Sequence, residues 1–178
     1  ISSVSGDISQ ISEILSALVF YMGVVILGLF VHMGITYMTL LKIFTTMDIK
    51  HFLKSMAPVQ LLGFSTSSSG ATLPVTMKRC EKDLGISEEI SSFVLPLGAT
   101  INMDGTALYQ GVAAVFIAQA VGMDLTLANQ FTIVATAVLA SIGTAAVPGA
   151  GIIMLIIILE AINVPSEGIA LILGVDRI

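Results

Sequence analysis

One carboxylate in the middle of an apolar segment constrains this chain more than any other feature. Between Ile90 and Met123, Asp104 is the only charged residue. Burying an unpaired charge in hydrocarbon costs on the order of several kcal/mol, so this carboxylate is paired, shielded from lipid or used. Asn102 and Gly105 flank it and are poor helix-interior residues. The segment predicts a membrane helix that unwinds at mid-depth, where exposed carbonyls beside a fixed negative charge coordinate small hard cations.

The composition indicates an integral membrane protein. Of the 178 residues, 56% are hydrophobic and 11% are charged, whereas a soluble domain carries about a quarter charged residues. We therefore expect a multi-pass protein of the cell membrane, in contact with the lipid bilayer. No basic arm or basic-aromatic face suggests nucleic acid as a partner.

The first part of the chain predicts a loop followed by one long helix. Residues 1–12 are rich in Ser, Gly and Asp and predict a loop. Residues 13–47 predict a transmembrane helix, because positions 14–41 carry no formal charge and can span the roughly 30 Å hydrocarbon core. His32 is the only side chain there that titrates near neutral pH. A proton relay and a hydrogen-bonded or interfacial histidine both remain open interpretations.

Charge placement predicts a re-entrant helical hairpin over residues 48–84. Positions 55–77 are uncharged, and six of the seven basic residues lie in the two clusters that flank them: Lys42, Lys50, Lys54, Lys78, Arg79 and Lys82. The positive-inside rule places both clusters on the cytoplasmic side, so the segment enters and leaves by one face. Its tip is a run of Ser and Thr at mid-membrane, which requires protein or water to satisfy the backbone.

Two further segments follow the same logic. Residues 88–122 predict the broken helix, with its gap at residues 102–106, because an unbroken helix of this length, at 1.5 Å per residue, would overshoot the bilayer. Residues 125–161 predict a second hairpin that opens to the outside, because the flanks are acidic only and Gly-rich positions 141–151 form its centre. A single kinked helix is the alternative, disfavoured by its length, three glycines and a proline.

The order of these segments predicts an inverted-topology repeat. The two tips end alike, in Ala-Thr-Leu-Pro at 71–74 and Ala-Ala-Val-Pro at 145–148. A second broken helix should then begin at residues 166–178, with Asp176 and Arg177 in its unwound middle. We therefore expect an all-α integral membrane fold with transmembrane helices, two re-entrant hairpins and a discontinuous helix. Because the chain stops inside this last element, we expect a fragment of a longer protein.

These segments resemble the glutamate/aspartate (dicarboxylate):cation symporter family. The matching blocks are residues 66–74, 96–107 and 140–151, and the second, with Asn-Met-Asp-Gly-Thr, is the most specific. The resemblance implies secondary active, cation-coupled symport by an elevator-like movement in a homotrimer. Residues 48–178 would be the core of the transport domain, with residues 13–47 leading into it. The scaffold helices that form the homotrimer would lie elsewhere in the protein.

The resemblance also implies two sets of site residues. Positions that touch the substrate, an acidic amino acid (glutamate or aspartate) or a C4-dicarboxylate, match Ser68, Ser69, Thr106, Val147 and Gly151. Positions that form the Na+ shells match the side chains of Asp104 and Asn102, the carbonyls of Gly98, Thr100, Ser141, Ile142 and Thr144, and Met103 beside them. Helix N-termini would bind the anionic substrate, and carbonyls of the unwound segments would bind the cation. The second hairpin, with glycine hinges, would be the gate, and a bound cation beneath it would hold it shut.

Two positions depart from relatives. Ser67 stands where the archaeal aspartate transporter has an arginine, and Arg177 is expected to supply that charge. Gln110 stands where mammalian glutamate transporters have a glutamate implicated in proton coupling. This favours Na+ over H+, although proton-coupled relatives with similar motifs keep H+ open. Small neutral amino acids also remain possible substrates.

Two other classes of function are weighed against a transporter. An intramembrane aspartyl protease needs two carboxylates that share a proton, and Asp104 has only Asp176 as a conceivable partner, so we expect no enzyme. An ion channel is the other alternative, because re-entrant tips can line filters. Saturable, sodium-dependent uptake into vesicles distinguishes the three.

Overall fold

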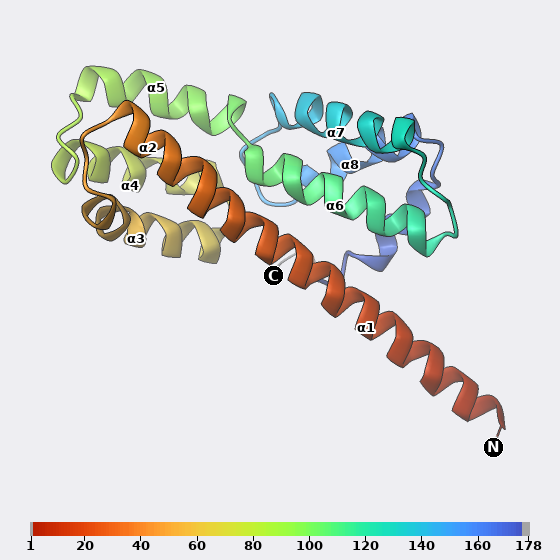
Figure 1. The fold of residues 1–178 in the computed structure, drawn as a ribbon. Coiled ribbons are helices and arrows are strands. Elements are labelled where there is room, and N and C mark those ends of the chain that lie inside the picture. Colours follow the sequence, from red (N-terminus) through yellow and green to blue (C-terminus); the bar gives the residue numbers. More distant parts are fainter. Residues whose placement is uncertain (1, 176–178) are drawn as a thin grey trace.

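The protein is built from helices. The computed structural model describes the backbone of residues 2–175 and the side chains of residues 12–175, and every regular element within these residues is a helix. The all-α part of the fold prediction is therefore confirmed. Figure 1 shows a long N-terminal helix that runs diagonally past two groups of helices, α3 to α5 and α6 to α8.

The N-terminal helix is continuous and contains a π-helical segment. α1 (Ser2–Val31) passes into the π-helix η1 (His32–Tyr37) and then into α2 (Met38–Phe44). Among the described residues, Ser12–Phe44 is the one stretch long and apolar enough to cross a membrane, and only 6% of its most apolar window is buried within the chain. The loop predicted for residues 1–12 is wrong from Ser2 onward, because an existing helix extends at little cost even through Ser and Gly.

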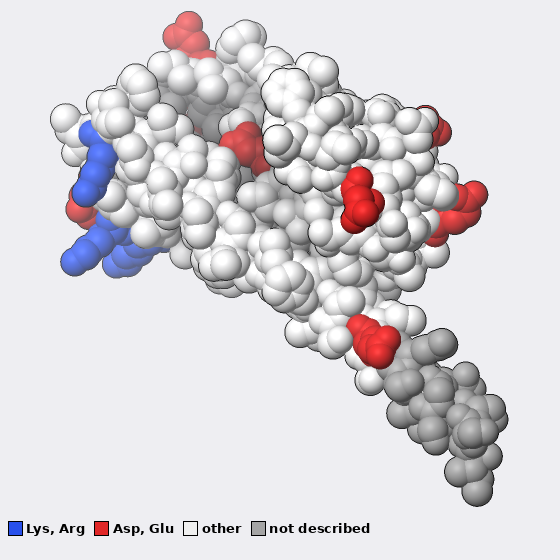
Figure 2. Space-filling view, turned by 45° about the vertical axis from the view of Figure 1, so that its right-hand side comes forward, with Lys and Arg blue, Asp and Glu red and all other residues white. Residues whose placement is uncertain are grey.

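α3 (Ile49–Thr66) and α4 (Ser69–Lys82) form an antiparallel pair joined by two residues. The Nε2 atom of His51 lies 2.9 Å from the carbonyl oxygen of Asp83, so the start of α3 and the end of α4 meet. The Lys and Arg side chains visible in Figure 2 gather at one end of the molecule. All the described ones belong to residues 42–82.

The next helix breaks where the sequence predicts, but the gap is narrower. α5 (Glu88–Ile101) and α6 (Asp104–Ala120) are separated by Asn102 and Met103, whose ψ angles of 79° and 53° are not helical. Asp104 to Thr106, expected in the gap, form the first turn of α6. A carboxylate is stabilised beside the positive end of a helix dipole, which accounts for a helix that begins at Asp104.

α6, α7 (Leu127–Ser141) and α8 (Ala150–Ala161) enclose the apolar core. The fully buried side chains Ile117, Ile133 and Leu155 come from these three helices in turn. Outside this core the surface is also apolar, with Phe20, Phe44, Phe64 and Phe131 each about three-quarters exposed. Large exposed apolar surface is unusual in a soluble monomer and fits contact with lipid.

The end of the described chain differs from the prediction. Instead of an α-helix, it forms the 3-10 helix η2 (Ser166–Leu171), a conformation typical of short connecting pieces. Gly168 lies against α6, where an added Cβ would come within 2.4 Å of the Ile117 side chain. The expected unwound middle at Asp176 and Arg177 lies outside the described residues.

Candidate functional site

The tips of the two helix pairs meet at one carbonyl oxygen. Ser68 is the N-cap of α4, and its hydroxyl accepts the N–H of Ala71 and donates to the carbonyl of Ala146 at 2.8 Å. The N–H of Gly70 donates to the same oxygen at 3.2 Å. An added Cβ on Gly70 would lie 2.9 Å from it. The donors at a helix N-terminus, which are suited to an anion, are here occupied by the second tip.

Two neighbouring cavities lie between the tips and the start of α6. The smaller, about 80 Å³, is lined by all five residues predicted to bind substrate, together with Met103 and Thr144. The larger, about 410 Å³, shares Thr106, Val147 and Gly151 with it. Small-molecule pockets are usually about 300–1,000 Å³, so the larger cavity alone has room for a substrate while the tips touch.

The second tip also touches the end of α5. The N–H of Gly143 donates to the carbonyl of Thr100 at 3.0 Å, which brings the predicted cation donors of α5 beside those of the tip. Ser141 and Thr144 are 5% and 2% exposed, while Ile142 is half exposed. A carbonyl oxygen has a second lone pair, so the Thr100 carbonyl keeps the capacity to bind a cation.

Asn102 and Gly98 lie at the helix break. The N–H of Asn102 donates to the carbonyl of Gly98 at 2.9 Å, which completes the last turn of α5. Met103 follows, and the hydroxyl of Thr106 lies 3.9 Å from its sulfur. Carboxylate, amide and carbonyl oxygens are ligands that hard cations prefer. The donor chemistry around the break therefore suits Na+.

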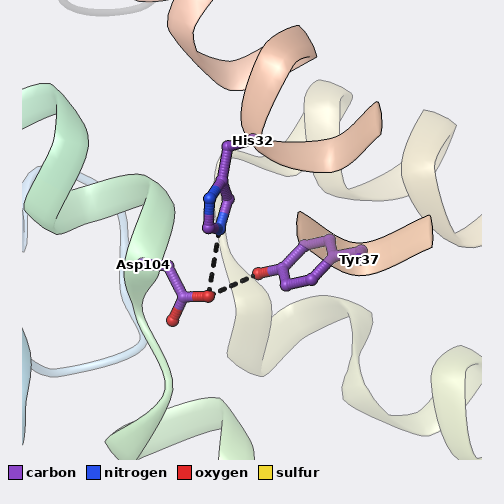
Figure 3. A network of polar contacts seen from close by, with 3 residues as sticks. All are labelled: His32, Tyr37 and Asp104. Atoms are coloured by element: carbon purple, nitrogen blue, oxygen red, sulfur yellow. Dashed lines mark hydrogen bonds and ion pairs between the residues drawn. The ribbon is translucent and has the colours of Figure 1, made fainter. Parts of the chain in front are cut away.

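The Asp104 side chain points toward the π-helical segment of the N-terminal helix (Figure 3). Its Oδ2 atom accepts the Tyr37 hydroxyl at 2.8 Å and lies 3.2 Å from Nε2 of His32. The sequence prediction missed both partners. A signal existed for His32, because polar groups inside a membrane pair with one another. None existed for Tyr37, because residues five apart point about 140° apart around an α-helix.

Gln110 joins α6 to the start of α8. Its side chain is fully buried, and its Nε2 atom donates to the carbonyl of Gly151 at 3.0 Å. Its Oε1 atom has no hydrogen-bond partner among the described residues. Gly151 lies close to α6, where an added Cβ would be 3.4 Å from the Thr106 methyl group. The far end of the second tip is therefore anchored on the helix that carries Asp104.

A third cavity lies away from this site. A cavity of about 660 Å³ lies between α1, α6 and α7 and is lined by apolar side chains such as Phe20, Phe116 and Ile133. Among the described residues that line it, the only polar side chains besides Tyr21 are Gln119 and Gln130, and none is charged. It suits neither an anionic substrate nor a cation.

A broken helix whose gap lies beside the tips of two helix pairs, in an apolar all-α chain, is the arrangement of secondary transporters with discontinuous helices. The comparison with known families agrees with this class. The profile of the sodium:dicarboxylate symporter family matches residues 3–178, and the chain belongs to that family. The resemblance identified in the sequence is confirmed.

Several characterised transporters are similar to this chain. Excitatory amino acid transporter 3 of Mus musculus is 45% identical over 175 residues, which cover 97% of this chain and 34% of that protein. Excitatory amino acid transporter 2 of Homo sapiens is 44% identical over 156 residues, 88% of this chain and 27% of that protein. Neutral amino acid transporter A of Bos taurus is 42% identical over 172 residues, which cover 97% of this chain and 32% of that protein. The chain thus spans about a third of the length of these relatives.

Proposed function

We propose that this chain is the substrate- and sodium-carrying part of a secondary active symporter for an acidic amino acid or dicarboxylate. The observation that carries the proposal is the meeting of three elements at two neighbouring cavities: the first tip, the second tip and the helix break. Membership of the sodium:dicarboxylate symporter family supports the coupling ion and the class of substrate. The protein would act as a transporter and not as an enzyme.

The substrate would bind where the tips now touch. Its carboxylate would replace the Ala146 carbonyl as acceptor for the Ser68 hydroxyl and the Gly70 N–H, so the two tips would separate to admit it. Ser69 would add its backbone N–H, Thr106 its hydroxyl, and Val147 and Gly151 their backbone groups. Donors at a helix N-terminus favour an anion, which supports an acidic substrate.

Sodium would bind at the helix break and beneath the second tip. Asp104 and Asn102 would supply side-chain oxygens. Carbonyls would come from Gly98, Thr100, Ser141, Ile142 and Thr144, with Met103 beside them. The contact between Gly143 and Thr100 supports coupling, because a cation shared by α5 and the second tip would hold that tip closed. Gln110 supports sodium over protons, because an amide at this buried position cannot take up and release a proton as a carboxylate does.

In the membrane, both helix pairs would be re-entrant hairpins and the chain would form part of an inverted repeat. The basic residues at the joined ends of α3 and α4 support a cytoplasmic location for that end. The domain would move across the bilayer as an elevator, within a homotrimer formed by scaffold helices. An elevator fits a site formed within this one chain.

A neutral amino acid is the second candidate substrate. The similarity to neutral amino acid transporter A favours it, since that relative is nearly as similar as the excitatory amino acid transporters. A positive group opposite the substrate side chain would favour an acidic over a neutral amino acid, and Arg177 is our candidate for that group. Replacing Arg177 by Ala should then abolish uptake of aspartate and leave uptake of alanine, if alanine is a substrate.

The test is uptake by the full-length protein in proteoliposomes. With an inward sodium gradient we expect saturable, concentrative uptake of radiolabelled aspartate, glutamate or succinate. Asp104→Asn should raise the sodium concentration for half-maximal uptake by more than about 100-fold, beyond the usual cost of losing an outer-shell partner. Asp124→Asn, in an exposed loop, is the matched control and should change little.

Three outcomes would contradict this proposal. Uptake driven by a pH gradient in sodium-free buffer would show that the coupling ion is H+ and not Na+. A flux that neither saturates nor concentrates the solute would favour a channel. Equal uptake by Asp104→Asn and Asp124→Asn would remove Asp104 from the cation site.

A further inference from the structure

The π-helical segment is the part of the N-terminal helix that reaches Asp104. An α-helix places residues five apart about 140° around its axis, so His32 and Tyr37 would not share a face. The i to i+5 hydrogen bonding of a π-helix brings such residues onto the same face, and short π segments occur frequently at functional sites. The ring centroids of these two residues are 4.9 Å apart, and both side chains meet the same carboxylate.

The two contacts divide the carboxylate into an occupied and an available oxygen. His32 and Tyr37 both lie against Oδ2 (Figure 3). Oδ1 has no hydrogen-bond partner among the described residues. A carboxylate held in this way has a fixed rotamer and presents one oxygen in one direction. Hydrogen bonds to ligating carboxylates commonly orient them in this manner.

We propose that Tyr37 is a positioning residue for the cation site: its hydroxyl pins Oδ2 of Asp104 so that Oδ1 is presented to sodium. The π-helical geometry places Tyr37 on the same face of the N-terminal helix as His32. The inference rests on the proposed function, because it assigns Asp104 to sodium. It extends that function to a residue on the N-terminal helix, outside the three segments that form the tips and the break.

The test measures sodium binding rather than transport. The full-length protein is purified in sodium-free choline buffer, and its melting temperature is followed as NaCl replaces choline chloride without amino-acid substrate. Tyr37→Phe removes the hydroxyl and keeps the ring beside His32. We expect it to raise the NaCl concentration for half of the melting shift by about 10–100-fold, the usual cost of losing an outer-shell hydrogen bond. Thr39→Val, which removes an exposed hydroxyl two residues away, is the matched control and should not change it.

The outcomes separate this inference from the proposed function. A merely structural role for Tyr37 would lower the melting temperature in choline buffer and leave the sodium midpoint unchanged, which would overturn the inference. A lower midpoint would also overturn it, since Tyr37 would then compete with sodium. If the unaltered protein shows neither a sodium-dependent shift nor sodium-dependent uptake, the proposed function itself fails.

Discussion

The two tips that meet at the site are built in opposite ways. In the first, only Ser67 and Ser68 separate α3 from α4, and Ser68 caps the second helix. In the second, eight residues, 142–149, separate α7 from α8. Gly143 and Gly149 within them adopt φ angles of +83° and +80°. One tip is a short turn that its own side chains stabilise, and the other is a longer loop with two glycine hinges.

This difference assigns different roles to the tips. Hydroxyls of the first tip bond to their own helices, as Thr66 does to Leu62 and Thr72 to Ser68. The second tip has one such bond, from the Thr144 hydroxyl to the Ala140 carbonyl of α7, and its contacts with the first tip and α5 are made through the backbone groups of Gly143 and Ala146. Few contacts and exposed backbone are features of segments that open locally at low free energy. We infer that the first tip is the fixed wall of the site and the second is the part that moves.

The largest expected effect comes from Gly70→Ala, which forces the tips apart. The new Cβ would lie 2.9 Å from the Ala146 carbonyl, and overpacking of this kind costs about 1–3 kcal/mol. If the second tip is the one that yields, amide hydrogen exchange at residues 142–149 should increase about 5-fold or more, the equivalent of that free energy. Exchange at residues 63–69 should not increase. Mass spectrometry of the substrate-free, full-length protein measures this.

Gly63→Ala is the matched control on the same helix pair. Its Cβ would lie 3.8 Å from the Thr72 methyl group, an ordinary contact, and Ala is favoured over Gly in a helix by up to about 1 kcal/mol. Gly63→Ala should therefore lower amide hydrogen exchange rather than raise it. Faster exchange in the first tip of Gly70→Ala would reverse the assignment of wall and gate.

How far the sequence could predict this site differs between its parts. The break at Asn102 follows from local residues, because Asn and Gly around a lone carboxylate oppose an apolar helix. The place where Ser68 meets Ala146 could not be predicted from local pattern, since it joins residues 78 positions apart through a backbone oxygen. The role of Ser68 was reached only through resemblance to a family, and no role was predicted for Ala146.

The errors in the prediction have local causes. The loop expected before Ser12 is helical because helix extension outweighs the weak propensities of Ser and Gly. The gap before Asp104 is short because the Asp104 carboxylate stabilises a helix start. The π-helical segment had no signal, since nothing in its composition marks an extra residue in the turn, and so Tyr37 was not expected to approach Asp104.

A smaller effect is expected from Gly143→Ala, which acts on one hinge of the second tip. The residue has a φ of +83° and open space around it, so the cost is backbone strain alone, about 1–2 kcal/mol. Exchange at residues 142–149 should rise roughly 5–30-fold, the equivalent of that free energy. Gly111→Ala in α6, also in open space but at a helical φ, is the control and should not raise it.

The smallest effect is expected from Ser67→Gly in the first tip. Ser67 has a φ of +48° and its side chain makes no hydrogen bond among the described residues. Glycine would relieve about 1 kcal/mol of strain, and its greater freedom in the unfolded chain would offset most of this gain. The melting temperature and the exchange of residues 63–70 should therefore stay nearly unchanged, because the Ser68 cap and the helix hydroxyls still define the turn. An increase in exchange as large as that of Gly143→Ala would mean that the first tip is held by Ser67 alone, and the contrast between a fixed and a moving tip would no longer stand.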